Sequence, residues 1–146
     1  MSEFFVARLR GRNEVPPVRS NAFGIAKFVT NKKKTKLKFF LEVNNIRDLV
    51  QAHIHFGERD ENGPVLAFLF GADVATLAEQ EGISTRQGVV QGIIKDEDIV
   101  DNNVGIDSVK ELIKAMEKGN TYVNVHTEQN PGGEIRGQIK KIHPIW

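Results

Sequence analysis

A period-two alternation of apolar and polar residues runs through most of this chain. It is clearest in Leu37–Val43 (LKFFLEV), Val50–Phe56 (VQAHIHF) and Thr121–Thr127 (TYVNVHT). Successive side chains of a β-strand point to opposite faces, so the alternation indicates strands with one buried face and one polar face. A chain built mainly from such strands must pair them into sheets, which excludes a helical bundle.

Further apolar segments, separated by turn residues, predict more strands. These are Phe5–Leu9, Ala22–Thr30, Pro64–Phe70, Gln87–Lys95 and Glu134–Ile142. Asn13–Val18 (NEVPPV) contains two prolines, which remove two backbone donors, so we expect a loop there. We expect another short loop around Ile46–Asp48 and a short helical turn in Ala72–Glu79. Turn signals recur about every 8–12 residues, and this spacing favours an antiparallel sandwich or barrel.

One α-helix is predicted between the last strands. Four apolar residues recur at helical spacing and form one stripe: Val109, Leu112, Ile113 and Met116. Ser108 and Glu111 fit a capping box, and Gly119 occupies the position where helices commonly end. The fold class predicted is therefore all-β with one helix, arranged as an antiparallel Greek-key β-sandwich or barrel.

Composition narrows the possible functions. The 146 residues fit a single domain over residues 1–146, and 20 basic against 19 acidic residues give a net charge of +1. This balance predicts no nucleic-acid partner. No apolar stretch is long enough to span a membrane, and the first residues do not resemble a signal peptide. The absence of cysteine excludes disulfides, thiolate metal sites and a cysteine nucleophile.

Histidine is therefore the remaining soft metal ligand, and the chain has four. His53 and His55 are two residues apart on a predicted strand and share one face, while Ala52 and Ile54 take the apolar face. The two histidines are expected at the outer surface. The same test places His126 on the outer face of its own strand, together with Tyr122 and Asn124.

Three such imidazoles are suitable ligands for copper, zinc, iron or nickel. A site with three neutral histidines and an open position is typical of catalytic rather than structural metal centres. The alternative is that these histidines are ordinary polar surface groups, because the sequence does not show that the two strands are neighbours. His143, which precedes Pro144, is interpreted as a surface residue.

Four motifs, in order along the chain, resemble the CHRD (chordin) domain family. They are Asn13–Val18 (NEVPPV), Ala52–Gly57 (AHIHFG), Glu61–Pro64 (ENGP), and Tyr122–Thr127 (YVNVHT) followed by Asn130–Gly137 (NPGGEIRG). The resemblance runs from about Phe4 to Ile142. The family is named for repeats in chordin, an extracellular antagonist of bone morphogenetic proteins, and it also occurs as single-domain microbial proteins. The resemblance implies a binding or interaction domain with an unknown protein partner, in an extracellular or cell-surface location.

Three segments are also similar, more distantly, to Cu/Zn superoxide dismutase. They are His53–Gly57, similar to its H-x-H-x-x-G copper strand, Tyr122–His126, similar to a later V-V-H strand, and Gly133–Gly137, similar to a segment whose arginine guides the anionic substrate. This resemblance implies a superoxide-dismutase-like fold. It also implies that His53, His55 and His126 bind copper, with Arg136 as a catalytic residue beside the ion.

The sequence departs from that family because no histidine lies between His55 and His126. The bridging ligand and the zinc ligands are therefore missing, and only a copper site could persist. The main interpretation is a CHRD-type interaction protein with a surface three-histidine copper site. The alternative is a copper-only, superoxide-dismutase-like oxidoreductase, and a third interpretation is a purely structural domain. Arg136 has its own alternative, a cross-strand ion pair with a nearby carboxylate.

Overall fold

Strands dominate the computed structural model, which describes residues 2–71 and 83–143. The strands are β1 (Phe4–Arg10), β2 (Phe23–Thr30), β3 (Lys36–Phe56), β4 (Val65–Phe70), β5 (Ile83–Lys95), β6 (Thr121–Thr127), β7 (Ile135–Gln138) and β8 (Lys140–Ile142). The helix is α2 (Val109–Glu117), and two 3-10 turns are η1 (Gly11–Asn13) and η2 (Asp96–Asp98). The helical turn expected in Ala72–Glu79 lies outside the described residues.

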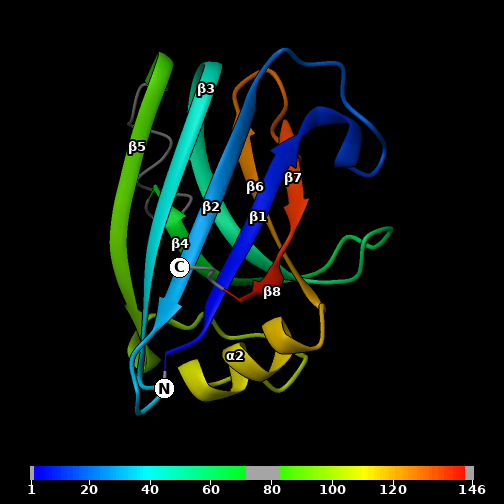
Figure 1. Cartoon of the computed structure of the whole chain (residues 1–146). Helices are drawn as coiled ribbons and strands as arrows, with labels where there is room; N and C mark the ends of the chain where they lie inside the picture. The colour runs from blue at the N-terminus through cyan, green and yellow to red at the C-terminus, as the bar shows by residue number, and fades with distance from the viewer. Residues whose placement is uncertain (1, 72–82, 144–146) are drawn as a thin grey trace.

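Five strands close into an antiparallel barrel. The ring runs β1–β2–β3–β6–β7 and returns from β7 to β1 through the pairing of Arg136 with Arg10. Strands β4 and β5 extend the sheet from β3, and β8 pairs with β1 (Figure 1). The predicted fold class, all-β with one helix in an antiparallel sandwich or barrel, is confirmed. Greek-key and superoxide-dismutase-like connectivity stays a prediction.

The loop expected around Ile46–Asp48 is absent, because β3 continues through it as one long strand. Asn45 and Asp48 adopt positive φ values of 53° and 55°, which bend the strand without ending it. Ile46 and Leu49 meanwhile keep their side chains in the core. The bend transfers the strand from its partners β2 and β5 to new partners, β6 and β4. It thereby carries His53 and His55 to the neighbourhood of β6.

The last expected strand, Glu134–Ile142, is divided into β7 and β8 by Ile139. This residue is fully buried, and its N–H donates to the carbonyl of Thr121 at 3.0 Å. The short break lets β7 pair with β6 while β8 pairs with β1.

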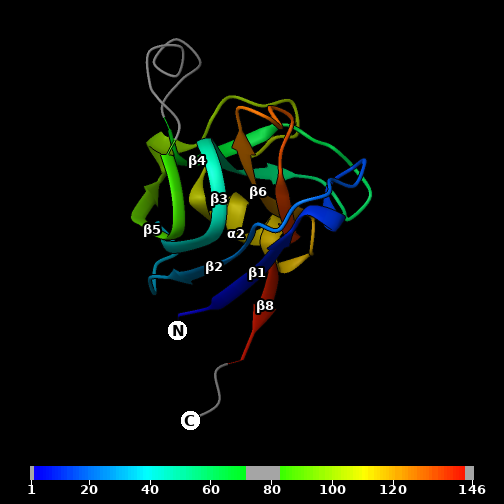
Figure 2. The ribbon, with the colours of Figure 1, turned by 90° about the horizontal axis from the view of Figure 1, so that it is seen from above.

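The helix α2 closes one end of the barrel. Figure 1 shows it below the strand ends, and Figure 2, which is seen from above, shows it within the outline of the strands. Ser108 accepts a hydrogen bond from the Glu111 N–H at 3.1 Å, as an N-cap does, and Gly119 has φ +76°. The predicted apolar stripe is buried in the core. Among the described residues, no helix has the length and apolar character needed to cross a membrane.

Candidate metal centre

The pairing of β3 with β6 brings the three histidines of the two strands together. In this pairing Gln51 is opposite His126, His53 is opposite Asn124 and His55 is opposite Tyr122. Each imidazole contributes one ring nitrogen to the cluster, and these three nitrogens all lie within 4.8 Å of one another. Residues that alternate with them, such as Ile54, belong to the core, so the cluster lies on the outside of the barrel. His143, interpreted as a surface residue, is exposed and outside the cluster.

The expectation that this cluster lies at the surface is wrong. The exposed fractions of His53 and His55 are only 4% and 8%, although His126 is partly exposed. Phe68 of β4 packs its ring edge-on against His53 at 4.4 Å between centroids. His55 is stacked on Tyr122 at 4.9 Å with 5° between the ring planes. Strand alternation predicts which face a residue takes, but β4 and the 57–64 segment that precedes it cover this outer face.

Backbone carbonyls orient two of the imidazoles. Nδ1 of His55 lies 2.9 Å from the Gly63 carbonyl oxygen, and Nδ1 of His126 lies 2.8 Å from the Pro131 carbonyl oxygen. A carbonyl oxygen only accepts hydrogen bonds, so Nδ1 carries the proton in both neutral rings. Each Nε2 then keeps its lone pair, and a second ring nitrogen bonded to a carbonyl is the usual support of a metal-binding histidine.

The nitrogen positions fit a shared ion. Nδ1 of His53 lies 3.1 Å from Nε2 of His126. Two nitrogens bound to one ion at about 2.0–2.1 Å each are about 2.9 Å apart at a right angle and about 3.3 Å apart at a tetrahedral angle. In the described structure, Nε2 of His53 and Nε2 of His55 are buried and have no hydrogen-bond partner. Buried polar atoms are normally paired, so the Nε2 of His55 indicates a ligand, while the Nε2 of His53 is the far nitrogen of a ring whose Nδ1 faces His126.

The three imidazoles are neutral at physiological pH. Burial, together with the charges of His126 and His55, lowers the pKa of His53 to about 3. Burial lowers the pKa of His55 to about 4, and burial also lowers the pKa of His126. A neutral imidazole is the form that binds a metal, so the cluster requires no deprotonation before binding.

Arg136 lies beside this cluster and is bound by its neighbours. Its exposed fraction is 1%, and its guanidinium lies over the Tyr122 ring at 3.5 Å. Its N–H groups donate to the carbonyl oxygens of Glu58, Arg59 and Glu61 and to Oδ1 of Asn62. The arginine therefore fixes the 57–64 loop, which connects β3 to β4 and carries the Gly63 carbonyl.

The alternative expectation for Arg136, a cross-strand ion pair, is wrong. None of the ion pairs in the described part of the chain includes it. Backbone carbonyls and an amide oxygen satisfy the guanidinium instead, because the 57–64 loop turns its carbonyls inward. A catalytic role for Arg136 stays a prediction.

Two further residues of this region were not marked by the sequence as site residues. Glu14 is 5% exposed, its Oε2 has no partner in the described structure, and burial raises its pKa to about 7. The side chain of Asn124 lies close enough to both groups to lower the pKa of Glu14 and to raise the pKa of His55. Alternation placed Asn124 on this face, but no pattern signals that a glutamate in a proline-rich loop is buried.

Comparison with known proteins agrees with the resemblance. The family model of the CHRD domain matches residues 5–139. Chordin of Danio rerio is 28% identical over 133 residues, which are 85% of this chain and 12% of that protein. The chain thus spans about an eighth of the length of this relative. The family match includes all three clustered histidines and Arg136, and it covers the barrel from β1 to β7. The chain belongs to the CHRD domain family.

Proposed function

We propose that this chain is an interaction domain that binds one transition-metal ion, copper by preference, through His53, His55 and His126. The family supports the interaction role. The observation that carries the metal role is the geometry of the buried imidazoles. Two are oriented by carbonyls, two have a buried nitrogen without a partner among the described residues, and all three are neutral.

The donor set supports copper over other ions. All three candidate ligands are imidazoles, which suit copper, zinc, iron and nickel, and copper is the most tightly bound of the divalent ions in this group. The 3.1 Å separation of the His53 and His126 nitrogens lies midway between the right-angle and the tetrahedral values, so the preference for copper rests on the donor set. The partly exposed His126 gives an ion a route into the cluster.

Titration calorimetry with Cu(II) and Zn(II) on the metal-free protein tests this proposal. We expect one Cu(II) per chain, and we expect His53→Ala and His126→Ala each to abolish saturable binding because a ligand is lost. His143→Ala is the matched control, since this exposed histidine lies outside the cluster, and it should bind as the parent does. A circular dichroism spectrum of each variant verifies folding. No saturable binding, or equal loss in His143→Ala, would contradict the proposal and leave the histidines as structural groups.

A second candidate is a copper-only, superoxide-dismutase-like oxidoreductase with Arg136 as the anion-binding residue. The observation in its favour is that the charge of Arg136 contributes to the lowered pKa of His55, which places the guanidinium within electrostatic reach of the cluster. Against it, the guanidinium already donates to four oxygens of the 57–64 loop. Accelerated decay of superoxide by the copper-loaded protein would support this candidate. Copper binding without accelerated decay of superoxide would eliminate this second candidate and leave the metal proposal intact.

A further inference from the structure

A basic groove of about 270 Å³ lies on the outer surface of the barrel. It is lined by Arg8, Arg59, Arg136 and Lys140, by two carboxamide side chains and by Val6. None of the described lining residues is acidic. The three clustered histidines are not among them, so the groove is a site of its own.

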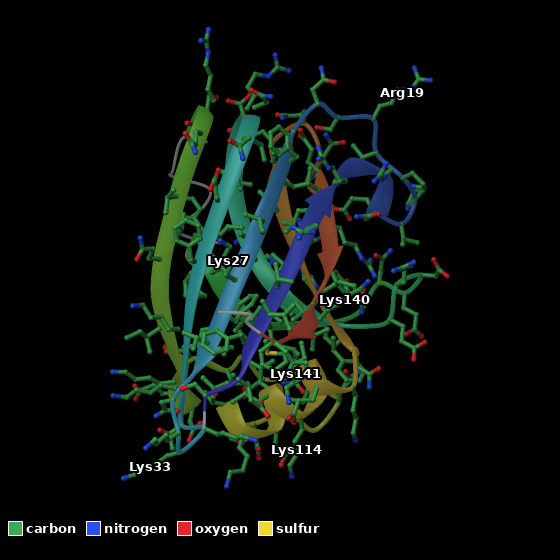
Figure 3. All side chains as sticks on the ribbon, viewed as in Figure 1. Arg19, Lys27, Lys33, Lys114, Lys140 and Lys141 are labelled. Carbon is green, nitrogen blue, oxygen red and sulfur yellow. The ribbon has the colours of Figure 1, made fainter. Side chains whose placement is uncertain are left out.

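Four separate segments supply the basic side chains: β1, the 57–64 loop, β7 and β8. Arg8 is on β1, two residues from Val6, so both point to the same face, and Lys140 of β8 is paired with Val6. Arg59 is carried by the 57–64 loop, which Arg136 holds through the loop carbonyls. Figure 3 labels Lys140 beside β8, on the side of the molecule where this loop projects. The fold therefore brings together basic side chains that are far apart in the sequence.

The three exposed basic side chains of this groove, Arg8, Arg59 and Lys140, make no ion pair within the described structure. The adjacent Lys141 differs, because its Nζ lies 3.2 Å from Glu3 and 3.9 Å from Glu117. A positive field therefore persists at the groove although the whole chain carries only +1.

We propose that this groove binds a ligand through a tetrahedral oxyanion, a phosphate or sulfate group. Two exposed guanidiniums can make bidentate hydrogen bonds to such an oxyanion, and Lys140 adds a compact point charge. Arg136 contributes a fixed positive charge below them. The volume is close to the lower end of small-molecule pockets, about 300 Å³, so it suits a free anion or a small ester.

A titration followed by amide chemical shifts tests the groove. The probe is inorganic phosphate, added at constant ionic strength, slightly above neutral pH, to protein freed of metal by dialysis against a chelator. We expect saturable shifts at Arg8, Arg59 and Lys140. Arg8→Gln and Arg59→Gln should each raise Kd by about tenfold or more, because each removes a charge-assisted hydrogen bond. Both side chains are exposed, so neither variant should unfold the barrel.

The controls are Arg19→Gln and Lys33→Gln, which remove exposed charges far from the groove and should leave Kd unchanged (Figure 3). Shifts that do not saturate, or an equal loss in these controls, would overturn the proposal in favour of diffuse electrostatics. Inorganic sulfate and glycerol phosphate are the further arms. If glycerol phosphate binds more tightly than inorganic phosphate, the groove is assigned to an esterified ligand. If the two bind equally, it is assigned to the free anion. The same titration on His126→Ala keeps the result independent of any metal.

Discussion

At the scale of single residues, two carbonyl oxygens decide what the histidine cluster can do. Without the contacts to Gly63 and Pro131, the rings of His55 and His126 could take either tautomer. With them, each Nε2 presents its lone pair. The His53 ring is held differently, between Phe68 and His126, so its orientation depends on packing. The H-x-H spacing does not predict these contacts, because the carbonyls lie 8 residues from His55 and 5 residues from His126 in the sequence.

Glu14 provides a prediction at the same scale. Burial raises the pKa of Glu14 to about 7 from a usual 4.5, despite the opposing effects of Arg136 and Asn124. The stabilisation from its protonated form is thus fully present below pH 4.5 and is lost as the pH rises through about 7. By linkage, the contribution of Glu14 to the free energy of unfolding should fall by about 3 kcal/mol over this window, whereas the three histidines, whose pKa values are lowered, contribute in the opposite sense. Glu14→Gln cannot ionise, so its free energy of unfolding should rise relative to that of the parent by about this amount as the pH increases through the window. Urea denaturation at a series of pH values measures the difference.

The control for Glu14→Gln is Glu97→Gln, which removes an exposed carboxylate of η2 and should retain the parental pH dependence. Parallel pH profiles for the parent and Glu14→Gln would show that Glu14 is ionised without penalty, and the prediction would fail.

At the scale of elements, local signals predicted β6 and α2, whereas β3 needed the tertiary structure. The bounds of β6 agree with its alternation, and α2 begins at its cap and ends before Gly119. Asn45 and Asp48 are residues that often occupy turns, and only the burial of Ile46 and Leu49 shows that the strand continues. Burial of the histidines likewise depends on the 57–64 loop. Contacts with residues far away in the sequence hold this loop in place.

The turn between β6 and β7, residues 128–134, gives a prediction for an element. Glu134 organises this turn by accepting hydrogen bonds at 2.7–3.0 Å from four side chains: Ser20, Thr127, Gln129 and Asn130. These bonds lower the pKa of Glu134 although burial opposes them. Glu134→Gln should reduce the free energy of unfolding by about 1–3 kcal/mol, as measured by urea denaturation.

The same turn carries the Pro131 carbonyl that orients His126, so its loosening should also weaken metal binding. Loss of such outer support typically costs about 10–100-fold in affinity, which calorimetry with Cu(II) would detect. Glu128→Gln is the matched control, because Glu128 is exposed on the same turn. Unchanged stability in Glu134→Gln would contradict the stability prediction, and unchanged copper affinity would separate the turn from the metal centre.

At the scale of the whole molecule, the 57–64 loop joins the two candidate sites. Its Gly63 carbonyl faces His55, and its Arg59 lines the basic groove. Asn62 of the same loop donates to the carbonyl of Val15, which connects two of the sequence motifs of the family. Arg136 holds the loop from below. A single buried arginine on β7 thus supports both the metal cluster and the anion groove, although its sequence context suggests only one of them.

Closure of the barrel provides the last prediction. At Gly137 of β7, an added Cβ atom would overlap the backbone of Arg8 on β1, and a backbone cannot move aside as a side chain can. Gly137→Ala should therefore force β1 and β7 apart and lower the free energy of unfolding by about 1–3 kcal/mol or more. Gly132→Ala is the matched control, because no atom lies within 4 Å of its added Cβ, and it should stay within about 0.5 kcal/mol of the parent. Urea denaturation compares them, and equal stability of the two variants would show that the β1–β7 contact does not close the barrel.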